Sequence, residues 1–102
     1  MIVTVFRSRL RKESEKDYQV RAKRMSELAS SMPGYVSHKS FTADDGERVT
    51  LVEFENADAQ RNWAIHPEHM QAQDSGRNSF YSQYKLQVCE IIRESEFSHS
   101  DG

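Results

Sequence analysis

The chain has 102 residues, a formal net charge of −2, 36% hydrophobic residues and 29% charged residues. A chain of this length forms one domain, and folding hides roughly 65% of the surface that it exposes when unfolded. The basic residues are scattered, which argues against a nucleic-acid or membrane surface, and no stretch approaches the ~20 apolar residues of a membrane span.

Residues 2–10 alternate between two faces and are rich in β-branched side chains, which predicts a first strand. Both faces are apolar over the first six of these positions. A sheet with one face in water would show polar side chains on that face. We therefore expect something to cover the second face of this strand.

A helix is predicted over residues 15–31, where apolar residues recur at helical spacing. Ser14, followed three residues later by Asp17, resembles a capping box at the start of this helix. Pro33 and Gly34 end the helix, because proline cannot continue the hydrogen-bond ladder and disfavours helix at the residue before it.

Two further strands are predicted over residues 35–42 and 48–55, with a turn at 43–47 between them. An Asp-Gly pair that ends at Gly46 indicates a hairpin, since glycine adopts a positive φ without steric cost. The two strands should pair antiparallel. His38 lies in the middle of the first of them and is interpreted as a structural or solvent-facing histidine.

Two short helices should follow the hairpin. Asn56 is suited to cap a helix over residues 57–65, which carries Trp63, the only tryptophan. Pro67 fits the first turn of a second helix, which carries His69. The segment is therefore expected to form a corner between two helices.

The last predicted strand covers residues 80–94 and is long for a sheet of this size. Its apolar positions fall on both sides: Tyr84, Leu86, Val88 and Ile92 alternate with Tyr81, Gln83, Cys89 and Ile91. Residues 95–102 are polar and predict a disordered tail, so that the folded domain should span residues 1–94.

Cys89 is the only cysteine and lies within this apolar strand pattern. It has no internal disulfide partner, so we expect a small buried side chain in a reducing compartment. The N-terminal apolar run is too short for a signal peptide. We expect a cytoplasmic protein whose ligand is small, nearly neutral and partly apolar.

The order strand, helix, strand, strand, helix pair, strand predicts an α+β protein with the ferredoxin-like βαββαβ fold, in which helices back one face of a four-stranded antiparallel sheet. The other face would be bare. Because the first and last strands are apolar on both sides, we expect this open face to stack on a second copy in an obligate homodimer. The long last strand could exchange contacts with the partner.

Several features in this order resemble the antibiotic biosynthesis monooxygenase (ABM) family: the first-strand pattern, the Met-Pro-Gly-Tyr entry at 32–35, the strand at 49–54, Trp63 and the closing strand. The resemblance covers residues 1–93. It implies a dimeric α/β barrel of ferredoxin-like subunits. Some members oxygenate phenolic or quinol-type aromatic molecules without metal or organic cofactor, some degrade haem, and many have no known activity.

Cofactor-free oxygenation of such a substrate needs a dry pocket, a base for the phenolic proton and a group that holds negative charge. The candidates are Trp63 as a pocket wall, His66 or His69 as the base, Arg77 and Tyr81 as groups that hold the oxyanion or orient the ring, and Asn62, which faces either the pocket or solvent. Structural roles compete with these: Trp63 as core packing, His66 as a helix cap and Arg77 as a helix C-terminal cation. The pocket should lie between the helices and the sheet.

Other site classes fit the residues less well. Haem-degrading relatives have an asparagine on the first strand and a proximal histidine about ten residues after the tryptophan, but this first strand has no asparagine and Gln73 stands at the second position. His66 and His69 alone make a weak zinc signal. We therefore predict no metal and no cofactor, with O2 and a small aromatic molecule as reactants. The alternative is a non-catalytic dimer of the same fold that binds a small ligand or has a structural role, and a haem-binding or haem-degrading relative is a further alternative.

Overall fold

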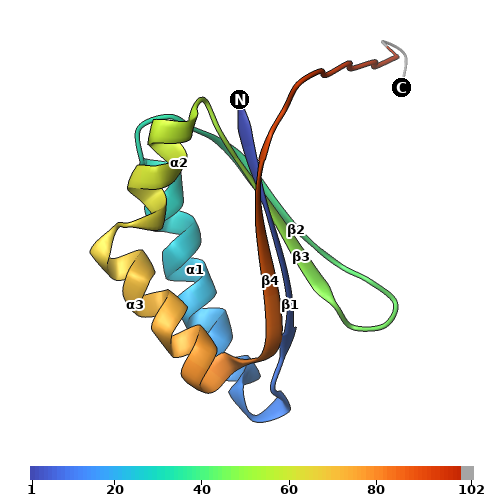
Figure 1. The fold of residues 1–102 in the computed structure, drawn as a ribbon. Helices are drawn as coiled ribbons and strands as arrows, with labels where there is room; N and C mark the ends of the chain where they lie inside the picture. The colour runs from blue at the N-terminus through green and yellow to red at the C-terminus, as the bar shows by residue number, and fades with distance from the viewer. Residues whose placement is uncertain (100–102) are drawn as a thin grey trace.

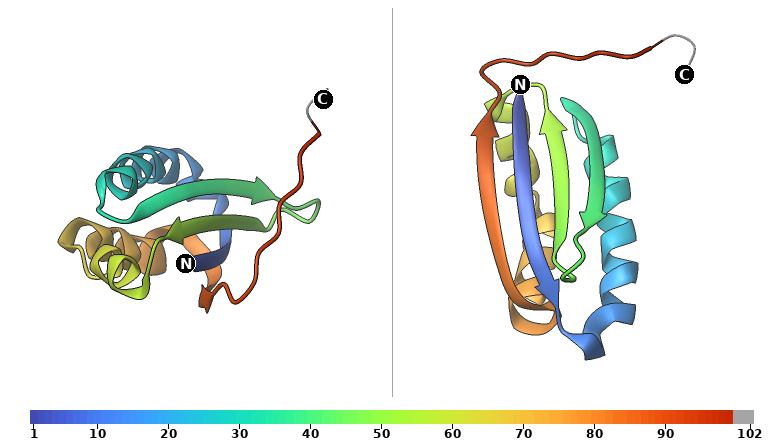
Figure 2. Two further views of the ribbon diagram at one scale, coloured as in Figure 1. Left: turned by 90° about the horizontal axis from the view of Figure 1, so that it is seen from above. Right: turned by 90° about the vertical axis from the view of Figure 1, so that its right-hand side faces the viewer.

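The computed structural model describes residues 1–99, and it confirms the predicted α+β fold (Figure 1). Its elements, in chain order, are β1 (Ile2–Leu10), a 3-10 turn η1 (Lys12–Ser14), α1 (Glu15–Ser31), β2 (Tyr35–Thr42), β3 (Arg48–Phe54), α2 (Ala57–Ala64), α3 (Pro67–Ser75), a π-helical turn η2 (Gly76–Phe80) and β4 (Tyr81–Glu90). The four strands form one sheet in the order β2-β3-β1-β4, and all neighbours are antiparallel. The helices cover one face of this sheet and leave the other open (Figure 2).

The last strand is shorter than predicted, because β4 ends at Glu90 rather than at residue 94. Its partner β1 begins at Ile2, so the ladder closes where the Ile91 N–H donates to the Met1 carbonyl at 3.0 Å. Residues 91–99 have neither helix nor strand, and the rest of the predicted tail, residues 100–102, lies outside the described residues.

The two helix-start signals in the sequence have different outcomes. The Asn56 side chain caps α2 as predicted, since its Oδ1 accepts a hydrogen bond from the Ala59 N–H at 2.9 Å. The capping box predicted at Ser14 is wrong, because the Ser14 side chain makes no cap hydrogen bond. Its hydroxyl donates instead to the Ser79 carbonyl at 2.6 Å and ties the start of α1 to the segment before β4. A long-range partner has replaced the local one.

The core lies between α1, α2 and the centre of the sheet. Ala29, Phe54, Ala59 and Trp63 are buried together, and Phe54 has no exposed surface. Gly34 brings the α1–β2 connection against α2. Its φ is +84°, and a Cβ atom at this position would lie 2.5 Å from the Ala59 Cβ. Glycine is therefore required here both by conformation and by space.

The strand register assigns each alternating set of side chains to one face of the sheet. Thr4 and Ser8 are buried under the helices, whereas Val5 and Leu51, which are opposite each other in the ladder, lie on the open face. The predicted grouping of Tyr81 with Gln83 and Cys89 is wrong. The register shifts between Arg9 and Leu10, and this irregularity turns Tyr81 toward the helices, where it packs against the Tyr18 and Phe6 rings.

Candidate functional site

Trp63 and His69 meet at the corner between α2 and α3. Their rings stack with centroids 4.0 Å apart and planes 13° from parallel. Trp63 is 7% exposed and belongs to the core, and His69 is half-buried. The indole therefore packs against the core and also supports one face of the imidazole.

The hydrogen bond of His69 determines which ring nitrogen carries the proton. Its Nδ1 lies 3.0 Å from the Trp63 carbonyl oxygen. A carbonyl only accepts, so Nδ1 carries the hydrogen and the lone pair of the neutral ring is on Nε2. Burial lowers the pKa of His69 below its ordinary value of 6.5, and the hydrogen bond to the Trp63 carbonyl offsets part of this effect. At neutral pH, His69 is an uncharged imidazole with an acceptor at Nε2.

His66 is the N-cap of α3, as the competing structural interpretation predicted. Its Nδ1 accepts a hydrogen bond from the Glu68 N–H at 3.2 Å, and Pro67 follows in the first turn. A proton on this nitrogen would break the cap. The Glu68 carboxylate in turn pairs with Arg24 on α1 at 2.5 Å, which fastens the corner to the neighbouring helix. Of the two candidate bases, His66 thus uses its Nδ1 atom to cap the N-terminus of α3.

Within residues 1–99, the side chains of the remaining predicted site residues make no hydrogen bond or ring contact with Trp63 or His69. Asn62 is exposed on α2. Arg77 lies in η2, where it pairs with Asp74 at 2.5 Å and donates to the Tyr84 hydroxyl at 3.4 Å. The hydrogen bond to Tyr84 raises the pKa of the Arg77 guanidinium, which therefore stays charged.

Tyr81 is a packing residue in this structure. Its ring lies against Gly76, where a Cβ atom would come within 2.6 Å of it. The ring centroid of Tyr18 is 5.8 Å away. Burial raises the pKa of the Tyr81 phenol well above its ordinary value of 10.0, so its hydroxyl stays protonated. Tyr84, which the sequence-based list of site residues omitted, is the tyrosine that contacts Arg77.

An exposed apolar surface lies on the helix-facing side of β4. Tyr84, Leu86 and Val88 are opposite Ser8, Phe6 and Thr4 in the ladder, and hence on the face that the helices cover. They are nevertheless 41%, 47% and 52% exposed. The helix layer therefore leaves this edge of the sheet accessible, and we call the three residues the β4 shelf. The alternation of these apolar residues along the strand is visible in the sequence and could have indicated this surface.

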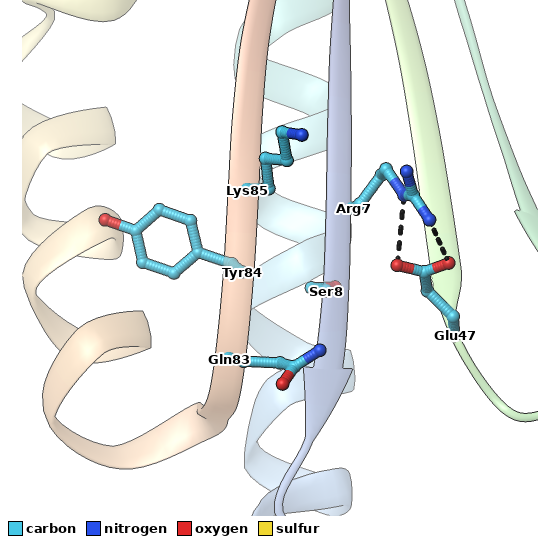
Figure 3. Close-up of a pocket in the computed structure, with 6 residues that line it drawn as sticks. All are labelled: Arg7, Ser8, Glu47, Gln83, Tyr84 and Lys85. Atoms are coloured by element: carbon cyan, nitrogen blue, oxygen red, sulfur yellow. Dashed lines mark hydrogen bonds and ion pairs between the residues drawn. The ribbon is translucent and has the colours of Figure 1, made fainter.

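A polar hollow of about 380 Å³ lies beside Arg7 (Figure 3). The Arg7 guanidinium makes two hydrogen bonds to the Glu47 carboxylate, at 2.8 and 3.0 Å. Gln83 and Lys85 of β4 complete the wall, while Tyr84 points away toward the edge of the sheet. This hollow could not be predicted from the sequence, because residues 7 and 47 meet only through the pairing of β1 with β3.

Within residues 1–99, no three His, Cys, Asp or Glu side chains converge in a way that would hold a metal ion. None of the helices in the same range combines the length and the apolar composition that a membrane span requires.

The fold and the α2–α3 corner define a ferredoxin-like α+β domain with helices on one face of the sheet. The chain belongs to the antibiotic biosynthesis monooxygenase family, whose model matches residues 1–75. It is 30% identical over 93 residues to YqjZ of Bacillus subtilis (strain 168), an uncharacterized protein. The aligned region covers 91% of this chain and 82% of YqjZ.

Solved structures show the same fold. A protein from Deinococcus radiodurans that bears the family name superposes with a TM-score of 0.85 at 12% identity, over 97% of this chain and all of the other (100%). SnoaB from Streptomyces nogalater, a cofactor-independent oxygenase, has a TM-score of 0.77 at 15% identity, over 91% of this chain and 94% of SnoaB.

Proposed function

We propose that this protein is a cofactor-independent monooxygenase of a small phenolic or quinol-type aromatic substrate. Family membership supports oxygenation, and the oxygenase SnoaB has the same fold. The observation that carries the proposal is the geometry of His69, whose ring stacks on Trp63 and whose Nδ1–H donates to the Trp63 carbonyl, so that Nε2 is the acceptor. Burial also lowers the pKa of His69. A neutral imidazole with a fixed tautomer is suited to accept a phenolic proton near neutral pH.

The proposed reaction uses the substrate as its own reductant. His69 Nε2 takes the phenolic proton, and the phenolate passes one electron to O2. The phenoxyl radical and superoxide then form a C–O bond at a ring carbon. The resulting peroxide anion takes the proton back from His69, and the hydroperoxide loses water. A ring CH2 group in the keto form thereby becomes C=O, with one oxygen atom in the product and the other in water. The protein needs to supply a base, a cation and exclusion of bulk water.

The β4 shelf is the proposed platform for the aromatic ring. It lies on the helix-facing side of the sheet and presents Tyr84, Leu86 and Val88 to solvent. Arg77, which also pairs with Asp74, donates to the Tyr84 hydroxyl at 3.4 Å, and we propose that an oxyanion on this surface would compete for the same guanidinium. We assign Trp63 the role of supporting the base rather than that of a direct wall, because the indole is 7% exposed.

We also propose that two copies associate through the open face of the sheet. Val3, Val5, Val49, Leu51 and Phe41 lie on it, and no element of residues 1–99 covers the face in Figure 2. Phe41 is 50% exposed, although an aromatic ring gains stability from burial. A second copy that presents the same surface would bury these side chains.

Oxygen uptake with a panel of quinols and naphthol-type phenols tests the proposed activity. We expect turnover with at least one of them, and a loss of about 10²–10⁴-fold in kcat in His69→Phe, which keeps an aromatic ring against Trp63 but has no base. His66→Asn retains a capping side chain and should keep most of the rate. His38→Gln, on β2, is the control for loss of a histidine.

Several results would contradict the proposal. Saturable stabilisation by a phenol without oxygen uptake would favour the non-catalytic binding module. Stoichiometric haem binding with release of iron under reducing conditions would favour the haem-degrading alternative. Loss of activity in His66→Asn, with full activity in His69→Phe, would show that the wrong histidine has been assigned as the base.

A further inference from the structure

Arg48 is a half-buried cation that forms no ion pair with any carboxylate of residues 1–99. It begins β3 on the helix-facing side, opposite Ser8 and Thr42. Its guanidinium lies over the Tyr18 ring, with Cζ 5.1 Å from the centroid. The Nε atom is buried and has no hydrogen-bond partner among the described residues. An unpaired polar group away from water is costly. Because Nε has no contact with solvent, only the outer Nη groups of this guanidinium are open to a ligand.

Four other arginines have the carboxylate partner that Arg48 lacks among residues 1–99. Arg7, Arg9, Arg24 and Arg77 each pair with a carboxylate at 2.5 to 2.8 Å. All four are at least one-third exposed, where water could have replaced the partner at little cost. Arg48 is half-buried, as Arg9 is, and yet no carboxylate of residues 1–99 lies within ion-pair distance of it.

A second hollow, of about 270 Å³, lies where Arg48 meets the start of α1. Arg11 and Lys12 bring two more cations to its wall, and Glu15 is the one acidic side chain there. The wall therefore carries three positive charges and one negative charge. Leu10, Thr42 and Gly46 complete it. At this volume the hollow holds more than a single anionic group.

We propose that this hollow binds a small organic anion through its carboxylate or phosphate group. The anion would accept a hydrogen bond from the Arg48 guanidinium, whose planar fork matches both groups. Arg11 and Lys12 would supply further positive charge at the mouth. The site lies at the end of the sheet on the helix-facing side, so association of two copies through the open face leaves it accessible. It is independent of the proposed oxygenase chemistry.

Titration of the 15N-labelled protein with inorganic phosphate and, separately, with benzoate tests this site. Chloride at matched ionic strength accounts for screening. We expect saturable shifts at the Gly46 amide and the Arg48 Nε–H with phosphate, benzoate or both, which also identifies the preferred group. Arg48→Gln should weaken binding about ten- to a hundredfold, as expected for loss of a charged hydrogen bond. Arg7→Gln, in the ion-paired hollow, should leave the affinity unchanged.

A further variant keeps the test decisive if Arg48→Gln does not fold. Lys12→Gln changes only an exposed side chain and should weaken the same anion severalfold. The proposal is wrong if neither anion produces saturable shifts at Gly46. It is equally wrong if folded Arg48→Gln, or Lys12→Gln when the former does not fold, binds as tightly as the unchanged protein.

Discussion

The imidazole of His69 carries two structural constraints at once. Its flat face stacks on Trp63 at 4.0 Å, and its Nδ1–H donates to the carbonyl of the same residue at 3.0 Å. The stack fixes the plane of the ring, and the hydrogen bond fixes its rotation within that plane. The Nε2 lone pair is thereby held in one direction, which is the property that a base or a hydrogen-bond acceptor requires.

The lowered pKa of His69 predicts a pH dependence of stability. Below pH 6.5 the histidine of the unfolded chain takes up a proton, while the folded one stays neutral until its own lower pKa is reached. The unfolded state then binds more protons, so the free energy of unfolding falls as the pH falls through this window. Urea unfolding between pH 5 and 7.5 should show a smaller slope in His69→Phe than in the unchanged protein.

His66→Asn is the matched control for this measurement, since asparagine retains an N-cap acceptor. It should keep the part of the slope that belongs to His69. An identical pH dependence in His69→Phe and the unchanged protein would show that His69 titrates alike in the folded and unfolded states.

The α1–β2 connection shows how one element constrains another. Gly34 takes a φ of +84° directly after Pro33 and faces Ala59 in the first turn of α2. The Glu55 N–H donates to the Gly34 carbonyl at 2.8 Å, which anchors the end of β3 to the same connection. The segment that follows α1 is therefore held against the segment that precedes α2 by contacts of Gly34, which only a residue without a side chain can make.

Gly34→Ala should be more destabilising than Gly46→Ala by about 1–3 kcal/mol, measured by urea unfolding. Both positions have positive φ, +84° and +91°, so both variants suffer backbone strain. Only Gly34 adds a clash, because nothing lies within 4 Å of a Cβ at Gly46. The double variant Gly34→Ala/Ala59→Gly should recover much of the difference. Equal losses at the two glycines would refute the close-packing explanation.

The two faces of the sheet differ along its length. At its centre the open face carries Val5 and Leu51 between Gln87 and Lys39. Near the hairpin the face is crossed by the ion pairs Arg7–Glu47 and Arg9–Asp45. The β4 shelf is on the opposite, helix-facing side. The molecule thus has two separate exposed apolar surfaces, which we assign to a second copy and to the substrate respectively.

Light scattering after size-exclusion chromatography tests the assignment of the open face. The unchanged protein should have twice the monomer mass at micromolar concentration, and Leu51→Lys should shift it toward the monomer, since a charge at a buried self-complementary interface is repeated on both sides. Leu86→Lys, on the β4 shelf, is the matched control and should remain dimeric. A monomeric unchanged protein would overturn the dimer, and dissociation only in Leu86→Lys would move the interface to the shelf.

Much of the fold was predictable because its determinants are local. Proline and glycine at 33–34 end α1, Asn56 and Pro67 begin α2 and α3, and alternation marks β1, β2 and β3. The prediction was wrong where a distant partner intervened. Ser14 bonds to Ser79 instead of capping its own helix, and β4 ends where β1 has no more residues to pair with.

The sequence by itself determined the element order, the ferredoxin-like fold and the corner that carries Trp63 and His69, because helix caps, turns and periodicity act over a few residues. Only the tertiary structure decided that Nδ1 of His69 holds the proton, that a register shift turns Tyr81 inward and that Arg48 is left without a carboxylate. Each of these depends on which atoms meet across the fold, and on how much water remains between them, and neither is encoded in local spacing.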